Sequence, residues 1–256
     1  MIHYDCHAHI FEGVDCIPGA RYVPQAPAPL DSWLRHLERH GLQGGVIVQV
    51  SFLGTDNSEL CSALEKVGAD NFAGVVVVAP NTQEAELDRL HALGVRGCRW
   101  NLVHGGSIPD LNDPVVKVFL QRIFARDMHI EVHLESPRLA GFISPLLAQG
   151  GKVVVDHLGL PSAVDPIDDP WLQALDQLTD MSRLYVKCSA LYRTSFNTCR
   201  HAETLLSKLP PDHLIWGSDW PHTQYDSVIN YDYVAGERHQ CIVESDEKAV
   251  KNLYGF

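Results

Sequence analysis

The sequence predicts a (β/α)8 barrel that forms a single domain over residues 1–256. Eight short apolar segments rich in β-branched residues alternate with longer amphipathic segments. The chain has 256 residues, which is the typical length of such a barrel. An open doubly wound sheet is the alternative, but the glycine-rich turn that often follows its first strand is absent, since Ala8 and Ile10 occupy that turn. The barrel is therefore the expected fold.

The expected strands are the eight apolar segments, at residues 2–7, 45–51, 73–79, 97–101, 130–134, 152–156, 184–189 and 214–218. The expected helices between them cover residues 30–40, 58–69, 83–93, 115–126, 138–149, 171–180 and 199–209. Gly41 and Gly94 follow two of these helices, and Asp113-Pro114 opens another, as helix ends favour. In the tail from Val228 to Phe256, only residues 246–253 are expected to be helical.

The composition favours a small-molecule partner. The formal net charge is −12, and no cluster of Lys and Arg offsets it, so binding to nucleic acid or to an anionic membrane surface is not expected. No apolar run approaches the roughly 18 residues of a membrane span, and no signal-peptide pattern opens the chain, which predicts a cytoplasmic protein. The 7 cysteines form no CxxC motif and are expected to be mostly reduced.

Histidine and aspartate collect where the expected strands end. His7 and His9 alternate onto one side of the first strand, His133 lies on the fifth strand, and His157 and Asp219 follow the sixth and eighth. Taken singly, each has an ordinary explanation, because a lone histidine is usually exposed or hydrogen-bonded and Asp219 could cap a helix. The C-terminal strand ends of a barrel face one mouth, so their joint placement predicts an active site there.

The motifs at these positions resemble the amidohydrolase superfamily. They are the HxH of residues 7–9, the histidine on strand five, Asp-His-Leu-Gly at 156–159 and Trp-Gly-Ser-Asp-Trp-Pro-His at 216–222. Arg21-Tyr22-x-Pro, Gln49-Val50-Ser51 and Gly97-Cys98-Arg99-Trp100-Asn101 are similar to the branch that contains 2-pyrone-4,6-dicarboxylate lactonase and sugar lactonases. The similarity covers nearly the whole chain.

The resemblance implies a hydrolase that opens a pyrone carboxylate or a sugar lactone by attack of water. Asp219 would be the general base, and His7, His9 and His157 would polarise the carbonyl group. The residues that the resemblance places in contact with substrate are Tyr22, Ser51, Arg99, His133 and Arg193. The branch carries a further arginine in the loop after strand four, but residues 102–107 contain none, so recognition of two carboxylates is not a firm expectation.

The resemblance favours catalysis without a cofactor, in which a protonated histidine does the polarising. A single divalent ion, Zn or Mn, is the other possibility, and its ligands would be His7, His9, His133 and Asp219. A binuclear site is not expected, because residues 97–101 offer no bridging lysine or glutamate. The alternative function is a mononuclear metal-dependent decarboxylase or hydratase that acts on an unsaturated dicarboxylic acid, as in other branches of the superfamily.

Overall fold

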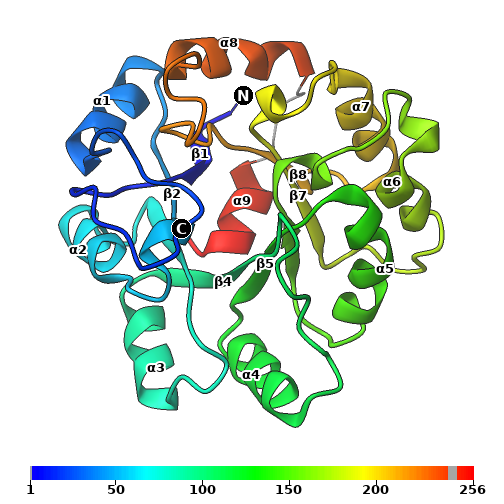
Figure 1. The fold of residues 1–256 in the computed structure, drawn as a ribbon, viewed down its shortest axis with the longest axis horizontal. Coiled ribbons are helices and arrows are strands. Elements are labelled where there is room, and N and C mark those ends of the chain that lie inside the picture. Colours follow the sequence, from blue (N-terminus) through cyan, green and yellow to red (C-terminus); the bar gives the residue numbers. More distant parts are fainter. Residues whose placement is uncertain (1, 242–246) are drawn as a thin grey trace.

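Eight parallel strands follow one another around the sheet in chain order (Figure 1). The computed structural model describes residues 2–241 and 247–256. The strands are β1 Tyr4–Ala8, β2 Gly44–Val48, β3 Phe72–Val76, β4 Val95–Asn101, β5 His129–His133, β6 Val153–Val155, β7 Leu184–Cys188 and β8 Leu214–Trp216. The ring nearly closes where the Asp219 amide donates to the His7 carbonyl at 2.8 Å. The predicted (β/α)8 barrel is therefore confirmed.

Helices surround the strands as the alternating pattern predicted (Figure 1). They are α1 Leu30–Arg39, α2 Ser58–Val67, α3 Glu84–Ala92, α4 Pro114–Ala125, α5 Ser136–Leu147, α6 Pro170–Leu175, α7 Cys199–Lys208, α8 Tyr231–Cys241 and α9 Glu247–Tyr254. α6 ends earlier than predicted, and α8 lies in the tail that had no assignment. The helix expected from Asp246 corresponds to α9, although Asp246 itself lies outside the described residues. None of the described helices is long and apolar enough to cross a membrane.

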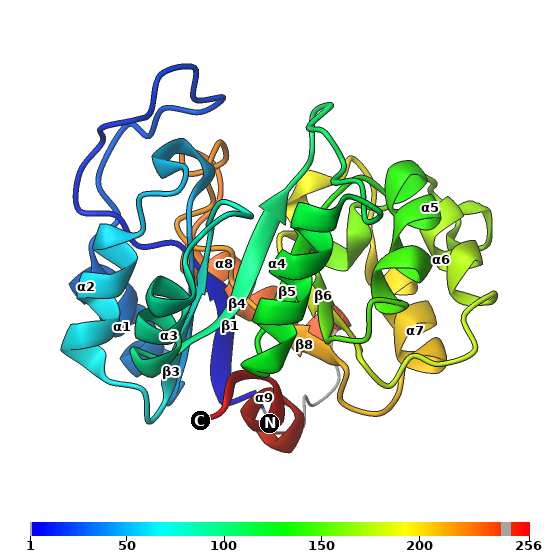
Figure 2. The ribbon, with the colours of Figure 1, turned by 90° about the horizontal axis from the view of Figure 1, so that it is seen from below.

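The two ends of the barrel are closed differently. Figure 2 shows α9 across one end, and the long loops that follow β1 and β4 rise from the other. The α9 residue Tyr254 is buried and its ring lies 5.5 Å from that of His129, at the start of β5. The N-terminal ends of the strands are therefore plugged by the tail, and the C-terminal ends form the open mouth.

Most of the cysteines that the structure describes are outside disulfides, as expected. They are Cys6, Cys16, Cys61, Cys98 and Cys188. Cys199 is disulfide-bonded, and its partner is not among the described side chains. The expectation that most cysteines are reduced is therefore confirmed, with Cys199 as an exception.

Asp5 ties the first and last parts of the barrel together. Its buried carboxylate accepts hydrogen bonds from the Ser218 amide at 2.7 Å, the Ser218 hydroxyl at 2.6 Å, the Trp33 indole at 2.9 Å and the Tyr231 hydroxyl at 3.0 Å. These donors come from α1, from the segment after β8 and from α8. His7 follows Asp5 by two positions, and Asp219 directly follows Ser218. The hydrogen bonds between Asp5 and Ser218 therefore also bring the side chains of His7 and Asp219 close together.

We expect Asp5→Ala to lower the free energy of unfolding by about 3 to 5 kcal/mol, because it leaves several buried donors without an acceptor. Urea titration followed by circular dichroism measures the change. Asp31→Ala is the matched control, since Asp31 is an exposed residue on α1 and should change stability by less than about 0.5 kcal/mol. Equal effects of the two substitutions would contradict the role given to Asp5.

Candidate active site

A pocket of about 560 Å³, part of it open to solvent, lies at the mouth of the barrel. Its lining includes every predicted site residue except His7, namely His9, Tyr22, Ser51, Arg99, His133, His157, Arg193 and Asp219. His7 is fully buried and lies within contact distance of Asp219, beneath this lining. The structure therefore brings together side chains that are up to 212 positions apart in the chain, as His7 and Asp219 are.

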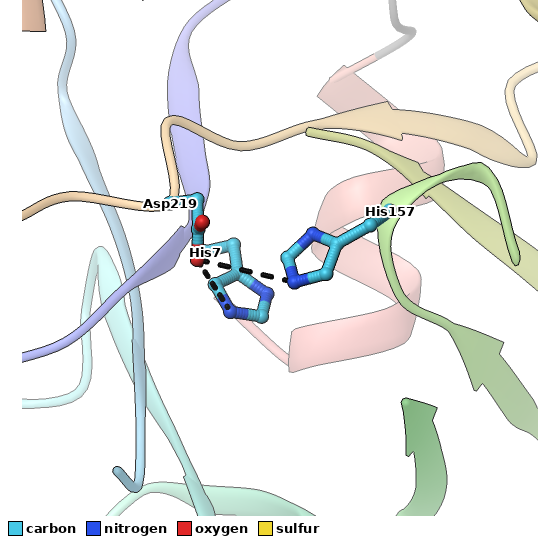
Figure 3. A group of neighbouring side chains, drawn as sticks. All are labelled: His7, His157 and Asp219. Atoms are coloured by element: carbon cyan, nitrogen blue, oxygen red, sulfur yellow. Dashed lines mark ion pairs between the residues drawn. The ribbon is translucent and has the colours of Figure 1, made fainter. Parts of the chain in front are cut away.

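Three imidazole rings converge on one oxygen of Asp219. The Oδ1 atom lies 3.6 Å from His7 Nε2, 3.5 Å from His9 Nε2 and 3.9 Å from His157 Nε2. Figure 3 shows His7 and His157 directed at the Asp219 carboxylate from two sides. This Oδ1 is buried and has no hydrogen-bond partner among the described residues. A buried carboxylate oxygen without a donor is costly, so something beyond these side chains is expected to meet it.

The other oxygen of Asp219 is fully engaged. Oδ2 accepts hydrogen bonds from the Tyr192 hydroxyl at 2.6 Å and from Arg193 Nη2 at 2.7 Å and Nε at 3.0 Å. Burial alone would raise the pKa of the Asp219 carboxyl, but the charge of Arg193 holds it well below its usual range. Asp219 is therefore ionised at neutral pH, with one oxygen fixed and the other free to react.

Burial governs the protonation of two histidines at the mouth. It lowers the pKa of His7 and of His157 to about 3. His9 Nδ1 lies 2.7 Å from the Val48 carbonyl, which can only accept, so Nδ1 carries a proton and Nε2 is the nitrogen that faces Asp219. Burial therefore disfavours protonated His7 and His157 as the groups that polarise the carbonyl.

Beneath His7 lies a layer of charged side chains that the sequence did not mark as part of the site. Lys187 Nζ contacts Glu131 Oε2 at 2.5 Å and His7 Nδ1 at 3.2 Å, and Asp156 Oδ1 lies 3.3 Å from the same His7 nitrogen. Lys187, Glu131 and Asp156 are all fully buried. The signal in the sequence was a charge inside an apolar strand, in LYVKC and HIEVH, which indicates a side chain that faces the barrel interior.

His133 and Arg99 form a separate part of the pocket. Arg99 donates to His133 Nδ1 at 3.2 Å and pairs with Asp156 Oδ2 at 2.8 Å. The His133 ring lies 4.8 Å from the ring of His157. Among the described residues, the groups able to hold a metal are His7, His157 and Asp219; His133, Asp156 and His157; and His7, Glu131 and Asp156. None of these groups contains both His133 and Asp219. Within the described residues, no contact joins His133 to Asp219, so His133 stands apart from the predicted metal set.

His7, His9 and Asp219 fit one divalent ion. The two Nε2 atoms are 3.3 Å apart, and each lies 3.5 or 3.6 Å from Asp219 Oδ1. Tetrahedral zinc with ligands at 2.0–2.1 Å needs ligand atoms about 3.3 Å apart. Binding of the ion through Nε2 would require the His7 proton on Nδ1, where Asp156 Oδ1 at 3.3 Å would accept it, although the Lys187 ammonium lies 3.2 Å from the same nitrogen. This arrangement gives a partner to the unpartnered oxygens of Asp156 and Asp219, but not to Glu131 Oε1.

The backbone has a positive φ at two of the predicted site residues. Asp219 has φ 59° and His157 has φ 53°, and the next residue, Leu158, has φ 54°. A positive φ is uncommon outside glycine and costs of order 1–3 kcal/mol where the region is sparsely populated. Strain at these strand ends is consistent with side chains held in place for a reaction.

The barrel mouth contains histidines and an aspartate at the C-terminal ends of β1, β5, β6 and β8. This arrangement is typical of hydrolytic and related barrel enzymes. The family model described as Amidohydrolase matches residues 4–251. The chain therefore belongs to the amidohydrolase family, as the resemblance of its motifs implied.

Relatives within this family are lactone enzymes. The chain is 27% identical over 235 residues to 4-sulfomuconolactone hydrolase of Rhizobium radiobacter, covering 87% of this chain and 76% of the relative. It is 24% identical over 268 residues to D-galactarolactone isomerase of Agrobacterium fabrum, covering 96% and 90%. A crystal structure from Acinetobacter baumannii, described as a probable 2-pyrone-4,6-dicarboxylic acid hydrolase with citric acid bound, is 33% identical with a TM-score of 0.86, and all of both chains is covered.

We expect the imidazole signals of His7 and His157 to remain unchanged from pH 8 to pH 5, because burial keeps both rings neutral. NMR of 15N-histidine-labelled protein, assigned with single His→Gln variants, measures this. The unfolded chain binds these protons near pH 6.5, so the free energy of unfolding should fall as pH decreases from about 6.5 towards 3. Titration of either ring near pH 6.5 in the folded protein would contradict the expectation.

Proposed function

We propose that this protein is a hydrolase that opens a lactone by attack of water, with Asp219 as the general base. The observation that carries the proposal is the unpartnered Oδ1 of Asp219, which is buried at the floor of a pocket and faces three imidazole rings. The names of the relatives support the lactone as the substrate class. The decarboxylase alternative has weaker support, because a solved decarboxylase is 14% identical and that likeness shows the fold alone.

The two oxygens of Asp219 have different roles: Oδ2 positions the carboxylate, and Oδ1 accepts the proton. Tyr192 and Arg193 fix Oδ2, which keeps Oδ1 directed at the pocket. Oδ1 takes a proton as the water oxygen bonds to the lactone carbonyl carbon, and the ring C–O bond then breaks. The proton held on Asp219 passes to the departing ring oxygen, so the product is a hydroxy acid. His9 and His157, both in the pocket lining, are placed to contact the carbonyl oxygen.

We propose a single divalent ion, zinc or manganese, as the cofactor, held by His7, His9 and Asp219 with His157 beside them. Such an ion would polarise the lactone carbonyl and offset the charge that develops on its oxygen. The neutral histidines and the unpartnered Oδ1 support this choice over catalysis without a cofactor. The cytoplasmic location expected from the sequence stays a prediction.

We expect Asp219→Asn to lower kcat for lactone opening by about 10³-fold or more, because the amide cannot take the proton from water. Acid release from a panel of aldonolactones and pyrone carboxylates, followed with a pH indicator, measures the rate. Asp88→Asn is the control, since Asp88 is an exposed α3 residue that pairs with Arg126. A variant that folds and keeps near wild-type kcat would exclude Asp219 as the base.

We expect dialysis against a strong chelator to abolish activity and zinc or manganese to restore it, with about one ion per chain by elemental analysis. Loss of the ion should also lower the melting temperature, because the bound ion stabilises the folded state. His7→Ala should reduce the metal content, whereas substitution of the exposed His104, outside this cluster, should not. Full activity at a metal content below one tenth of an equivalent would favour catalysis without a cofactor.

A further inference from the structure

We propose that Arg21 binds a carboxylate of the lactone substrate. The inference rests on the proposed function and narrows its substrate class. Arg21 lies in the loop between β1 and α1, at the exposed rim of the pocket, and forms part of the lining. Arginine is the side chain best suited to this role, because its planar guanidinium forms paired hydrogen bonds with a carboxylate.

Three arginines line the pocket, and two of them already have carboxylate partners. Arg99 lies 2.8 Å from Asp156 and 3.6 Å from Glu131. Arg193 lies 2.7 Å from Asp219. Their charges are therefore matched within the protein, and a substrate carboxylate would have to compete with a buried partner for either one.

The contacts of Arg21 are to neutral oxygens. Its Nη1 donates to the Val103 carbonyl, and its Nη2 donates to Asn101 Oδ1 at 3.1 Å. In the part of the chain that the structure describes, no carboxylate pairs with it. A guanidinium has five N–H donors, so these contacts leave donors as well as a full positive charge for a ligand.

Contacts from α5 and the residue before it fix the loop after β4, against which Arg21 lies. Arg138 donates to the Leu102 carbonyl at 2.7 Å and to the Gly106 carbonyl, and Glu135 accepts from the His104 amide at 2.6 Å. The loop after β4 is therefore fixed where Arg21 contacts it. A guanidinium that is already positioned loses less conformational entropy when it binds a ligand, which favours a receptor role.

The charges of the mouth and its floor favour an anionic substrate. The cations are Arg21, Arg99, Lys187 and Arg193, and the carboxylates are Glu131, Asp156 and Asp219. At the rim, Glu135 pairs with Arg138 at 3.1 Å, and Asp226 is exposed to solvent. The cations exceed the carboxylates even before the proposed ion is counted, and Arg21 is the arginine of the lining that no carboxylate of the described residues pairs with, so a substrate carboxylate would meet it without displacing a buried partner.

The test compares Arg21→Gln with the wild type on three substrates that differ in charge: a neutral aldonolactone, a lactone with one carboxylate and a pyrone dicarboxylate. Wild-type kcat/KM should be higher for the carboxylated lactones than for the neutral one. Arg21→Gln should lower kcat/KM for the monocarboxylate by about 10- to 100-fold, mainly through KM, and should change the neutral lactone by less than about twofold. Arg21→Lys, which keeps the charge without the fork, should lie between the two.

Arg35→Gln is the matched control, because Arg35 is an exposed arginine on α1 that contacts Ser32 rather than the pocket. Equal losses on neutral and charged lactones in Arg21→Gln would overturn the proposal, since they would indicate that Arg21 only holds the loop. Equal wild-type activity on neutral and carboxylated lactones would also overturn it, and lactone hydrolysis itself would still stand.

Binding of gluconate, measured by calorimetry, separates this inference from the proposed function. If no lactone were opened, the proposed function would fail, but gluconate binding that is lost in Arg21→Gln and kept in Arg35→Gln would still support Arg21 as a carboxylate receptor. Equal binding by the wild type and Arg21→Gln would overturn that role.

Discussion

Burial of three carboxylates inside the barrel is the constraint on which the site depends. Glu131, Asp156 and Asp219 are all fully buried, and an unpaired charge there would be prohibitive. Lys187, Arg99 and Arg193 reach them from β7, β4 and the segment after β7, so the strand ends are bound together by charge pairs. The positions of the histidines follow from this network, because His7 lies between Lys187, Asp156 and Asp219.

The same network explains why Asp219 has two unlike oxygens. Tyr192 and Arg193 occupy Oδ2, which compensates the buried charge and lowers the pKa of the carboxyl, whereas Oδ1 faces the imidazole rings of His7, His9 and His157. A carboxylate stabilised in this way is a weak base in isolation. An ion held by His7, His9 and Asp219 would place a positive charge beside Oδ1 and would lower the pKa of the attacking water, which is the chemical reason for proposing it.

The fold and the membership of the mouth could be predicted from the sequence because both depend on local patterns. β-branched strands such as GVIVQVS and capped helices such as the one that Asp113-Pro114 opens carry their signal in a few adjacent residues. α8 was missed because it has almost no amphipathic pattern. The sequence could not predict that His133 lies apart from His7, His9 and Asp219. Its position depends on Arg99, which contacts both His133 and Asp156 on neighbouring strands.

Arg21 was recognised in the sequence as part of a motif, but it was not predicted to be a site residue. The motif resemblance predicted substrate contact for Tyr22. It assigned no role to Arg21, the residue before it in the same motif. Its importance depends on what surrounds it: two other arginines are neutralised by Asp156 and Asp219, and only then does the remaining cation become distinctive. Because charge balance in a pocket is a property of the whole set of side chains, the specificity of such a barrel is best read from unmatched charges rather than from motifs.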